Sequence, residues 1–282
     1  MLYTVSIAVV SENHEPDRAF GIKLASEVFL AVATLMGLTA LVASRWGFSG
    51  TVLALAGVVG VAALCGLPAI PPRRALTPPE QRFGMTRRAG ACAPFLRDWA
   101  PWLGLAALFV SFAGLSALWA FLARIAPSFG IGGATTAAVL TAGLLVSGLA
   151  GLAAAGLGDR FGRVKPLVAG MLLAIAGVAM LQWGHGLAGY LAGLLLAAGL
   201  WNFPLAYQMG LIASSDGNGR VAVLMPAALA IGGAIGPILA GALLTGGHGY
   251  LPLYCLFAIA TAAGLAAFTV LGRRLASAGV RP

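Results

Sequence analysis

The sequence predicts an all-α integral membrane protein, a polytopic helical bundle with about eight complete transmembrane helices. Apolar residues make up 60% of the 282 residues and charged residues only 9%, whereas roughly a quarter of the residues in soluble domains carry charge. The mean hydropathy of the chain is +0.95. Apolar stretches recur at the length of about 20 residues that a helix needs to cross a bilayer. The 40 glycines fit helices that approach each other closely in a membrane.

Eight stretches of the chain are long and apolar enough to be predicted as spans. Each is apolar on all sides, and residues typical of turns separate most of them. Residues 1–10 are apolar but too short to cross a bilayer. We interpret them as the end of a helix whose beginning is absent from this chain, with a signal peptide as the alternative. The predicted spans are 22–44, 48–70, 99–123, 134–157, 166–183, 187–212, 221–245 and 250–271.

One long polar stretch, rich in Pro and Arg, interrupts the apolar pattern at residues 71–98. Its polar composition predicts a linker. This linker leaves two spans before it and six after it. The chain then divides into four parts. They are a partial N-terminal bundle (1–70), the linker (71–98), a six-helix bundle (99–272) and a tail (273–282).

The basic residues predict the orientation of the chain. If successive loops alternate sides, fifteen of the seventeen Lys and Arg residues fall on one side, and the other side keeps only Arg45 and Arg124. The positive-inside rule then places the linker and the C-terminus in the cytoplasm, as expected of a plasma (inner) membrane protein. Because these residues spread over several short loops, they argue against nucleic-acid binding. Their expected partner is anionic lipid at the cytoplasmic face.

The loop at residues 155–167 reads AGLGDRFGRVKPL. It resembles the G-x-L-a-D-R-x-G-R-[KR]-x-x-L signature of the major facilitator superfamily. Two positions depart from that signature: Ala155 replaces the leading Gly, and Val164 replaces the second basic residue. An ordinary turn, in which Gly162 permits a positive φ, is the alternative interpretation. The positions that agree are Asp159, Arg160, Gly162, Arg163 and Leu167.

The resemblance implies which part of a twelve-helix transporter this chain covers. In that family the signature joins the second and third helices of each half, and its position here is that of the second copy. The chain then resembles helices four or five to twelve. The implied function is secondary active transport of a small solute by alternating access, with a proton or sodium gradient as the candidate driving force. The alternative is a truncated remnant or half-transporter that needs the missing N-terminal helices or a partner chain.

Polar and aromatic residues in the predicted spans are candidates for a substrate cavity. In the resembled family this cavity lies between two six-helix bundles. Phe112, Ser116 and Trp119 recur at i, i+4 and i+7 and so share a helix face. A second group of polar and aromatic residues lies in the span at 187–212. Because buried amides need hydrogen-bond partners or water, this group either lines the cavity or bonds to neighbouring helices. That group comprises Trp201, Asn202, Tyr207 and Gln208.

Glu27 is the one acidic residue clearly inside a predicted span, about two turns from its cytoplasmic end. Carboxylates inside a membrane are functional candidates. In the resembled fold the loop of the second repeat meets the cytoplasmic end of helix five, which implies a pairing of Glu27 with Arg160 or Arg163. Such a pair would latch the two halves in one conformation. A proton-carrying role for Glu27 is the alternative.

A second motif, in the span at 221–245, is interpreted as a packing surface. Gly232, Gly236 and Ala240 recur every four residues and present a smooth helix face. Pro237 frees a backbone carbonyl and can bend the helix.

The remaining chemistry-bearing residues do not form a site in the sequence. The three cysteines are scattered, and the three histidines are isolated in loops. No pattern for a metal centre or a nucleophilic triad can be assembled from them. The sequence therefore predicts no enzyme, no metal and no cofactor.

Overall fold

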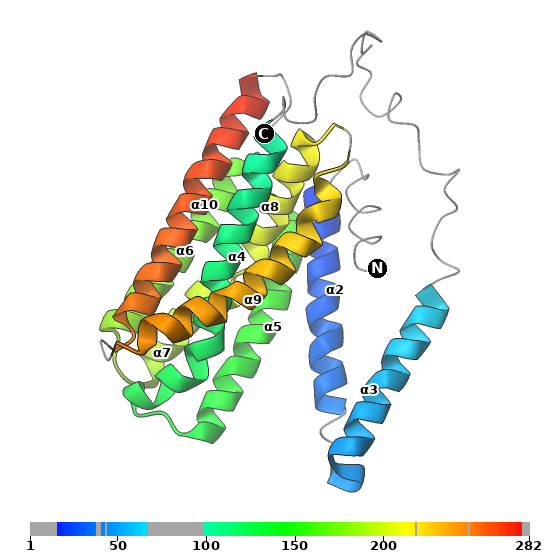
Figure 1. Ribbon diagram of the computed structural model, residues 1–282, viewed down its shortest axis with the longest axis vertical. Coiled ribbons are helices and arrows are strands. Elements are labelled where there is room, and N and C mark those ends of the chain that lie inside the picture. The colour runs from blue at the N-terminus through cyan, green and yellow to red at the C-terminus, as the bar shows by residue number, and fades with distance from the viewer. Residues whose placement is uncertain are drawn as a thin grey trace. The chain divides into compact units, whose positions relative to one another are not determined.

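The computed structural model describes residues 16–37, 41–42, 44–66, 99–217, 219–246 and 249–277. Six helical spans in this part of the chain are long and apolar enough to cross a membrane. Figure 1 shows them running alongside one another as a bundle. The helices are α4 (Trp99–Ile125), α5 (Gly133–Leu157), α6 (Val164–Trp183), α7 (Gly186–Leu194) with α8 (Asn202–Ser215), α9 (Met225–Leu244) and α10 (Leu251–Ser277).

The all-α fold and the six predicted spans after the linker are confirmed, but the count of eight spans is not. The first two predicted spans correspond to α2 (Pro16–Gly37) and α3 (Ser44–Gly66). Helix α2 begins six residues earlier than predicted and carries charged residues in its first half, and a non-helical backbone at Gly47 interrupts α3. The interpretations of residues 1–10 and 71–98 lie outside the described residues.

The chain divides into two compact units that differ from the predicted domains. Leaving aside the first two residues of the chain, one unit comprises residues 3–29 and 98–282. The other unit comprises residues 30–97. The first half of α2 therefore groups with the six-span bundle. Helix α10 continues to Ser277, beyond the predicted end of the bundle at residue 272.

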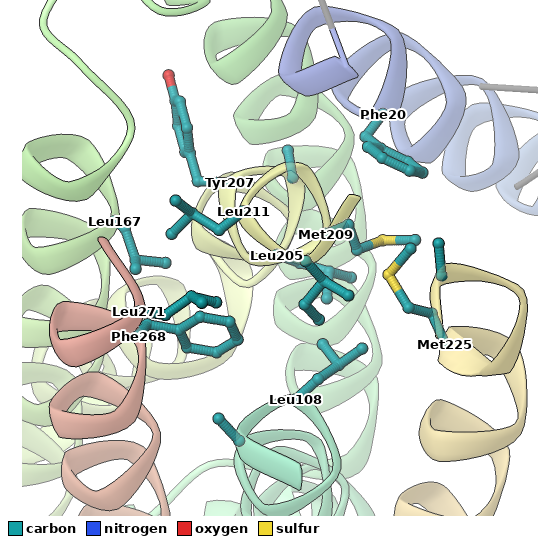
Figure 2. Close-up of a cluster of buried hydrophobic side chains, with 14 of the residues drawn as sticks. Phe20, Leu108, Leu167, Leu205, Tyr207, Met209, Leu211, Met225, Phe268 and Leu271 are labelled. Atoms are coloured by element: carbon teal, nitrogen blue, oxygen red, sulfur yellow. The ribbon is translucent and has the colours of Figure 1, made fainter. Parts of the chain in front are cut away.

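The bundle has two hydrophobic core clusters at opposite ends. We call the end where α6 begins the Arg163 end, and the end where α4 terminates the Arg124 end. The core at the Arg163 end centres on α8, and Figure 2 shows Phe20 of α2 among its side chains. The core at the Arg124 end is built from the second half of α4, α7 and the start of α10.

The span predicted at 187–212 is one crossing but two helices. A π-helical turn, Leu195–Gly199, separates α7 from α8, and the Leu200 N–H donates to the Leu195 carbonyl at 2.9 Å. Pro204 has no N–H, so it cannot donate to the carbonyl of Leu200 as a regular helix requires. The Phe203 N–H donates to that carbonyl instead, at 2.9 Å. The break lies just before the proline, and Trp201 stands at the bend.

Candidate functional site

The signature loop folds as a tight turn at the Arg163 end. Gly158 and Gly162 adopt φ angles of 53° and 73°, which residues with a Cβ rarely adopt. The Gly162 N–H donates to the Asp159 carbonyl at 2.9 Å and closes the turn. Asp159 and Arg160 are exposed, whereas Arg163 is buried. The turn thus directs one of its two arginines into the protein.

Arg163 connects three helices through its guanidinium group. Its Nε donates to Oδ2 of Asp17, in the first turn of α2, and forms an ion pair. Its Nη1 donates to Oγ of Ser214, near the end of α8, at 2.7 Å. Asp17 is 1% exposed and Arg163 8%. The guanidinium therefore joins α2, the start of α6 and the end of α8 in a site largely closed to water.

The backbone of α8 is shaped to accept this ion pair. A Cβ atom added at Gly210 would lie 1.8 Å from Oδ1 of Asp17, so a side chain there would displace the carboxylate. The Ser214 hydroxyl, while it accepts from Arg163, donates to the Gly210 carbonyl at 2.8 Å. Removing one partner of a buried ion pair strands the other charge, at a cost of about 3–5 kcal/mol. Asp17 and Arg163 are therefore strongly dependent on each other.

The predicted pairing of Glu27 with Arg160 or Arg163 is wrong. Glu27 accepts from Lys23 one turn earlier on α2, and its side chain is 41% exposed. It lies ten residues beyond Asp17, which is about 15 Å along a helix. The acid that reaches the loop is Asp17, which the sequence analysis missed because it began this helix at residue 22. Pro16 followed by Asp17 is a recognisable signal for an earlier helix start.

Helix α2 also packs closely against α5. A Cβ added at Gly21 would lie 2.6 Å from the Gly151 carbonyl oxygen, and one at Gly151 would lie 3.0 Å from the Gly21 carbonyl oxygen. About one helical turn before Gly151 on α5, the Phe29 ring covers Gly148. Small residues allow such close helix contacts in membranes. The described part of α2 is thus held both by the ion pair and by a glycine contact that the sequence analysis did not identify.

Three of the predicted cavity residues lie together. Phe112 of α4, Trp201 directly before α8, and Gln208 of α8 line a cavity of about 50 Å³ within the bundle. The rings of Phe112 and Trp201 are 5.8 Å apart, and Gln208 Nε2 lies 3.7 Å from the sulfur of Met171. Thr261 of α10 lines the same cavity. This volume admits a few water molecules but is far below the roughly 300 Å³ of small-molecule sites.

The other two predicted residues of α8 face α5. Asn202 is buried, and its Nδ2 donates to the carbonyl and to Oγ of Ser147 at 3.2 and 3.3 Å. The buried Tyr207 hydroxyl donates to the Ala154 carbonyl at 3.4 Å. Asn202 Oδ1 is buried without a hydrogen-bond partner among the described residues. The polar residues of α8 thus divide between α5 and the small cavity.

Ser116 and Trp119 lie elsewhere on α4. The Ser116 hydroxyl lies 3.1 Å from the Gly232 carbonyl of α9 and also 3.1 Å from the Ala113 carbonyl of its own helix. Trp119 packs against the core cluster of the Arg124 end. The residues predicted to share a face therefore meet different neighbours at different heights of the bundle.

Helix α9 presents its small residues to α4. A Cβ at Gly236 would lie 2.2 Å from the Ala113 carbonyl oxygen, and one at Gly232 would lie 2.9 Å from the Phe109 carbonyl oxygen. Ala240 is fully buried in the second core cluster, and Pro237 lies half-buried inside α9. Helices α4 and α9 consequently approach each other nearly backbone to backbone.

The described residues contain no group of three or more His, Cys, Asp or Glu side chains able to hold a metal ion. Asp216, after α8, is buried and accepts from the N–H groups of Val221 and Ala222 at 2.6 and 2.8 Å. It therefore caps the turn that leads into α9, a backbone role for a buried carboxylate.

Comparison with known protein families identifies the six-span part of the chain. The family model described as Major Facilitator Superfamily matches residues 104–281, which is more than half of the chain. No curated protein matches the chain.

Proposed function

Because the chain belongs to the major facilitator superfamily, a family of membrane transporters, we propose that it carries out secondary active transport of a small solute by alternating access. In this mechanism two structural halves rock about a site near the middle of the bilayer. The Asp17–Arg163 ion pair is the latch that holds one of the two conformations.

The observation that carries this proposal is the burial of the ion pair between α2 and the loop of the six-span bundle. A buried ion pair is costly to strand but gains solvation when water reaches both partners. The same pair therefore favours the closed arrangement and permits opening when a gap fills with water. An apolar contact of similar size would resist hydration.

The charge distribution suggests which side this latch closes. The excess of Lys and Arg in the loops at the Arg163 end suggests that this end faces the cytoplasm of a cell bounded by its plasma membrane. On this proposal the latched conformation is closed to the cytoplasm. Breaking the ion pair favours the conformation that is open to it.

Phe112, Trp201 and Gln208 are the candidates for solute contact. They share the small cavity beside the break between α7 and α8. The cavity of about 50 Å³ is too small for a metabolite in this conformation, so binding requires α8 to move. Its release from the latch at Gly210 and Ser214 provides that freedom. A proton or sodium gradient is the proposed driving force.

The latch is tested by the reactivity of a buried cysteine. Ser147→Cys is nearly isosteric, is fully buried on α5, and lies beside the Gly148 position that Phe29 covers. In a C65S/C92S chain reconstituted in vesicles, Asp17→Asn is expected to raise the maleimide labelling rate of this cysteine about tenfold. The exposed Cys255 serves as an internal standard whose rate stays constant.

The matched control is Glu27→Gln, which removes a carboxylate of the same helix that pairs with Lys23, one turn away. It is expected to leave the labelling rate unchanged. The exchanged pair D17R/R163D is expected to return the rate toward that of the parent chain. Equal labelling in the parent and Asp17→Asn chains would reject the latch.

Transport itself is tested in vesicles with an imposed proton or sodium gradient. Solutes that raise the Tm of the purified chain are offered to vesicles, and uptake that an ionophore abolishes supports secondary active transport. Gln208→Ala is expected to weaken uptake, while Gly217→Ala, at an exposed loop glycine with open space around it, leaves it intact. Uptake that is insensitive to both ionophores would contradict ion coupling.

A further inference from the structure

The strongest unexplained feature is a group of exposed cations at the Arg163 end. Arg160 lies in the signature loop, Lys165 in the first turn of α6, and Arg273 near the end of α10, and all three are exposed. None of them has an ion-pair partner among the residues that the structure describes. The buried Arg163 between them is committed to Asp17. These three cations therefore take no part in the latch.

Two of these cations flank a close contact between helices. A Cβ added at Gly272 of α10 would lie 2.3 Å from a methyl carbon of Val164, at the start of α6. Lys165 and Arg273 are the next residues on the two helices. The glycine contact thus brings two positive charges from distant parts of the sequence to neighbouring positions. Like charges repel, and an anion bound beside both residues would relieve that repulsion.

Exposed aromatic residues accompany the cations. Phe161, next to Arg160 in the loop, is 63% exposed, and Trp99, at the start of α4, is 46% exposed with Arg274 4.5 Å above its ring. Both helices that carry the flanking cations, α6 and α10, are apolar spans. Aromatic rings at the end of such spans are typical of the depth of lipid headgroups. The cations are therefore placed where phosphate groups lie.

We propose that Lys165, Arg273 and Arg160 form a binding site for the phosphate of an anionic phospholipid beside the contact between α6 and α10. Charge complementarity and interfacial depth favour a lipid over a soluble anion, because a soluble phosphate would gain nothing from the neighbouring Phe161. Asp159, an exposed acid in the same loop, is expected to disfavour headgroups that approach the site from the side of the loop. Basic pockets between helices on the cytoplasmic side bind anionic headgroups in this manner.

The site is tested by lipid retention on the full chain. The protein is reconstituted in nanodiscs with equal parts of phosphatidylglycerol and phosphatidylcholine, then released into detergent, and the retained lipids are counted by native mass spectrometry. The double variant K165Q/R273Q is expected to lower phosphatidylglycerol affinity by roughly 25-fold, about fivefold for each cation. Phosphatidylcholine retention is expected to stay constant.

The matched control is R45Q/R124Q, which removes the same charge from the two basic residues predicted to face the other side of the membrane. It is expected to retain phosphatidylglycerol like the parent chain. Equal retention by K165Q/R273Q and the parent, or equal losses in the two double variants, would overturn the site. Displacement of the lipid by millimolar glycerol phosphate alone would overturn the assignment to a lipid in favour of a soluble anion. None of these outcomes depends on transport.

Discussion

The two ends of the six-span bundle are joined by different chemistry. At the Arg163 end, side chains of opposite charge meet between α2, α6 and α8. At the Arg124 end, tyrosine hydroxyls donate to backbone carbonyls: Tyr190 to Leu122 at 2.9 Å, and Tyr250 to Arg124 at 2.6 Å. Loss of one partner leaves a buried charge uncompensated at the Arg163 end, but only one neutral hydrogen bond unmade at the Arg124 end. The two ends therefore differ in whether a pair of opposite charges or neutral hydrogen bonds join the helices.

The largest expected effect comes from stranding Arg163. Asp17→Ala leaves a buried guanidinium without its counter-charge, so the free energy of unfolding is expected to fall by about 3–5 kcal/mol. Denaturant titration of the purified chain in detergent, followed by tryptophan fluorescence, measures this change. The double variant D17L/R163M is expected to recover most of the lost stability, because apolar pairs replace buried ion pairs well. A loss below about 1 kcal/mol in Asp17→Ala would show that water already reaches the pair.

A smaller effect is expected from crowding the ion pair instead of breaking it. Gly210→Ala places a methyl group where Oδ1 of Asp17 now lies, and overpacking of this kind costs about 1–3 kcal/mol. Gly217→Ala, seven residues later with no atom within 4 Å of its Cβ position, is the control that is expected to change little. The Tm of the two variants, measured side by side, tests this: Gly210→Ala is expected to have the lower value. Equal Tm values would mean that the carboxylate moves aside freely.

The smallest effect belongs to the Arg124 end. Tyr190→Phe removes one hydrogen bond from a fully buried ring, at an expected cost of about 1 kcal/mol. Tyr250→Phe is expected to cost less, because its bond is exposed. Neither variant is expected to change the labelling rate of the Ser147→Cys probe. Faster labelling in Tyr190→Phe would mean that the neutral hydrogen bonds also control access to the probe, which would break the contrast between the two ends.

Sequence reasoning succeeded where a feature is local. Each of the six spans is set by its own apolar composition, and the turn at Gly162 by its own glycine. Only one partner of the ion pair could be predicted from the sequence. Arg163 belongs to a recognisable pattern, whereas its partner lies 146 residues away. Asp17 carries no mark of pairing in the sequence beyond its place at a helix start. The pairing depends on how α2 packs, which composition does not specify.

The shared face of α4 shows a second limit of prediction from residue spacing. The spacing of Phe112, Ser116 and Trp119 correctly groups them on one side of a helix. It does not reveal that α8, α9 and the Arg124-end core succeed one another along that side. The same holds for α8, where adjacent residues Trp201 and Asn202 serve different neighbours. Periodicity gives direction around a helix, and only packing gives the partner at each height.

The distance in sequence between Asp17 and Arg163 also orders the events of biosynthesis. The carboxylate leaves the ribosome 146 residues before the guanidinium that neutralises it. At about 5–20 residues per second, this interval lasts roughly 7–30 s. During that time α2 must wait at the insertion machinery or in the bilayer with an acid that has no counter-charge from the bundle. Completion of the core around Phe20 is therefore a late step, because its partners on α8 are made after Arg163.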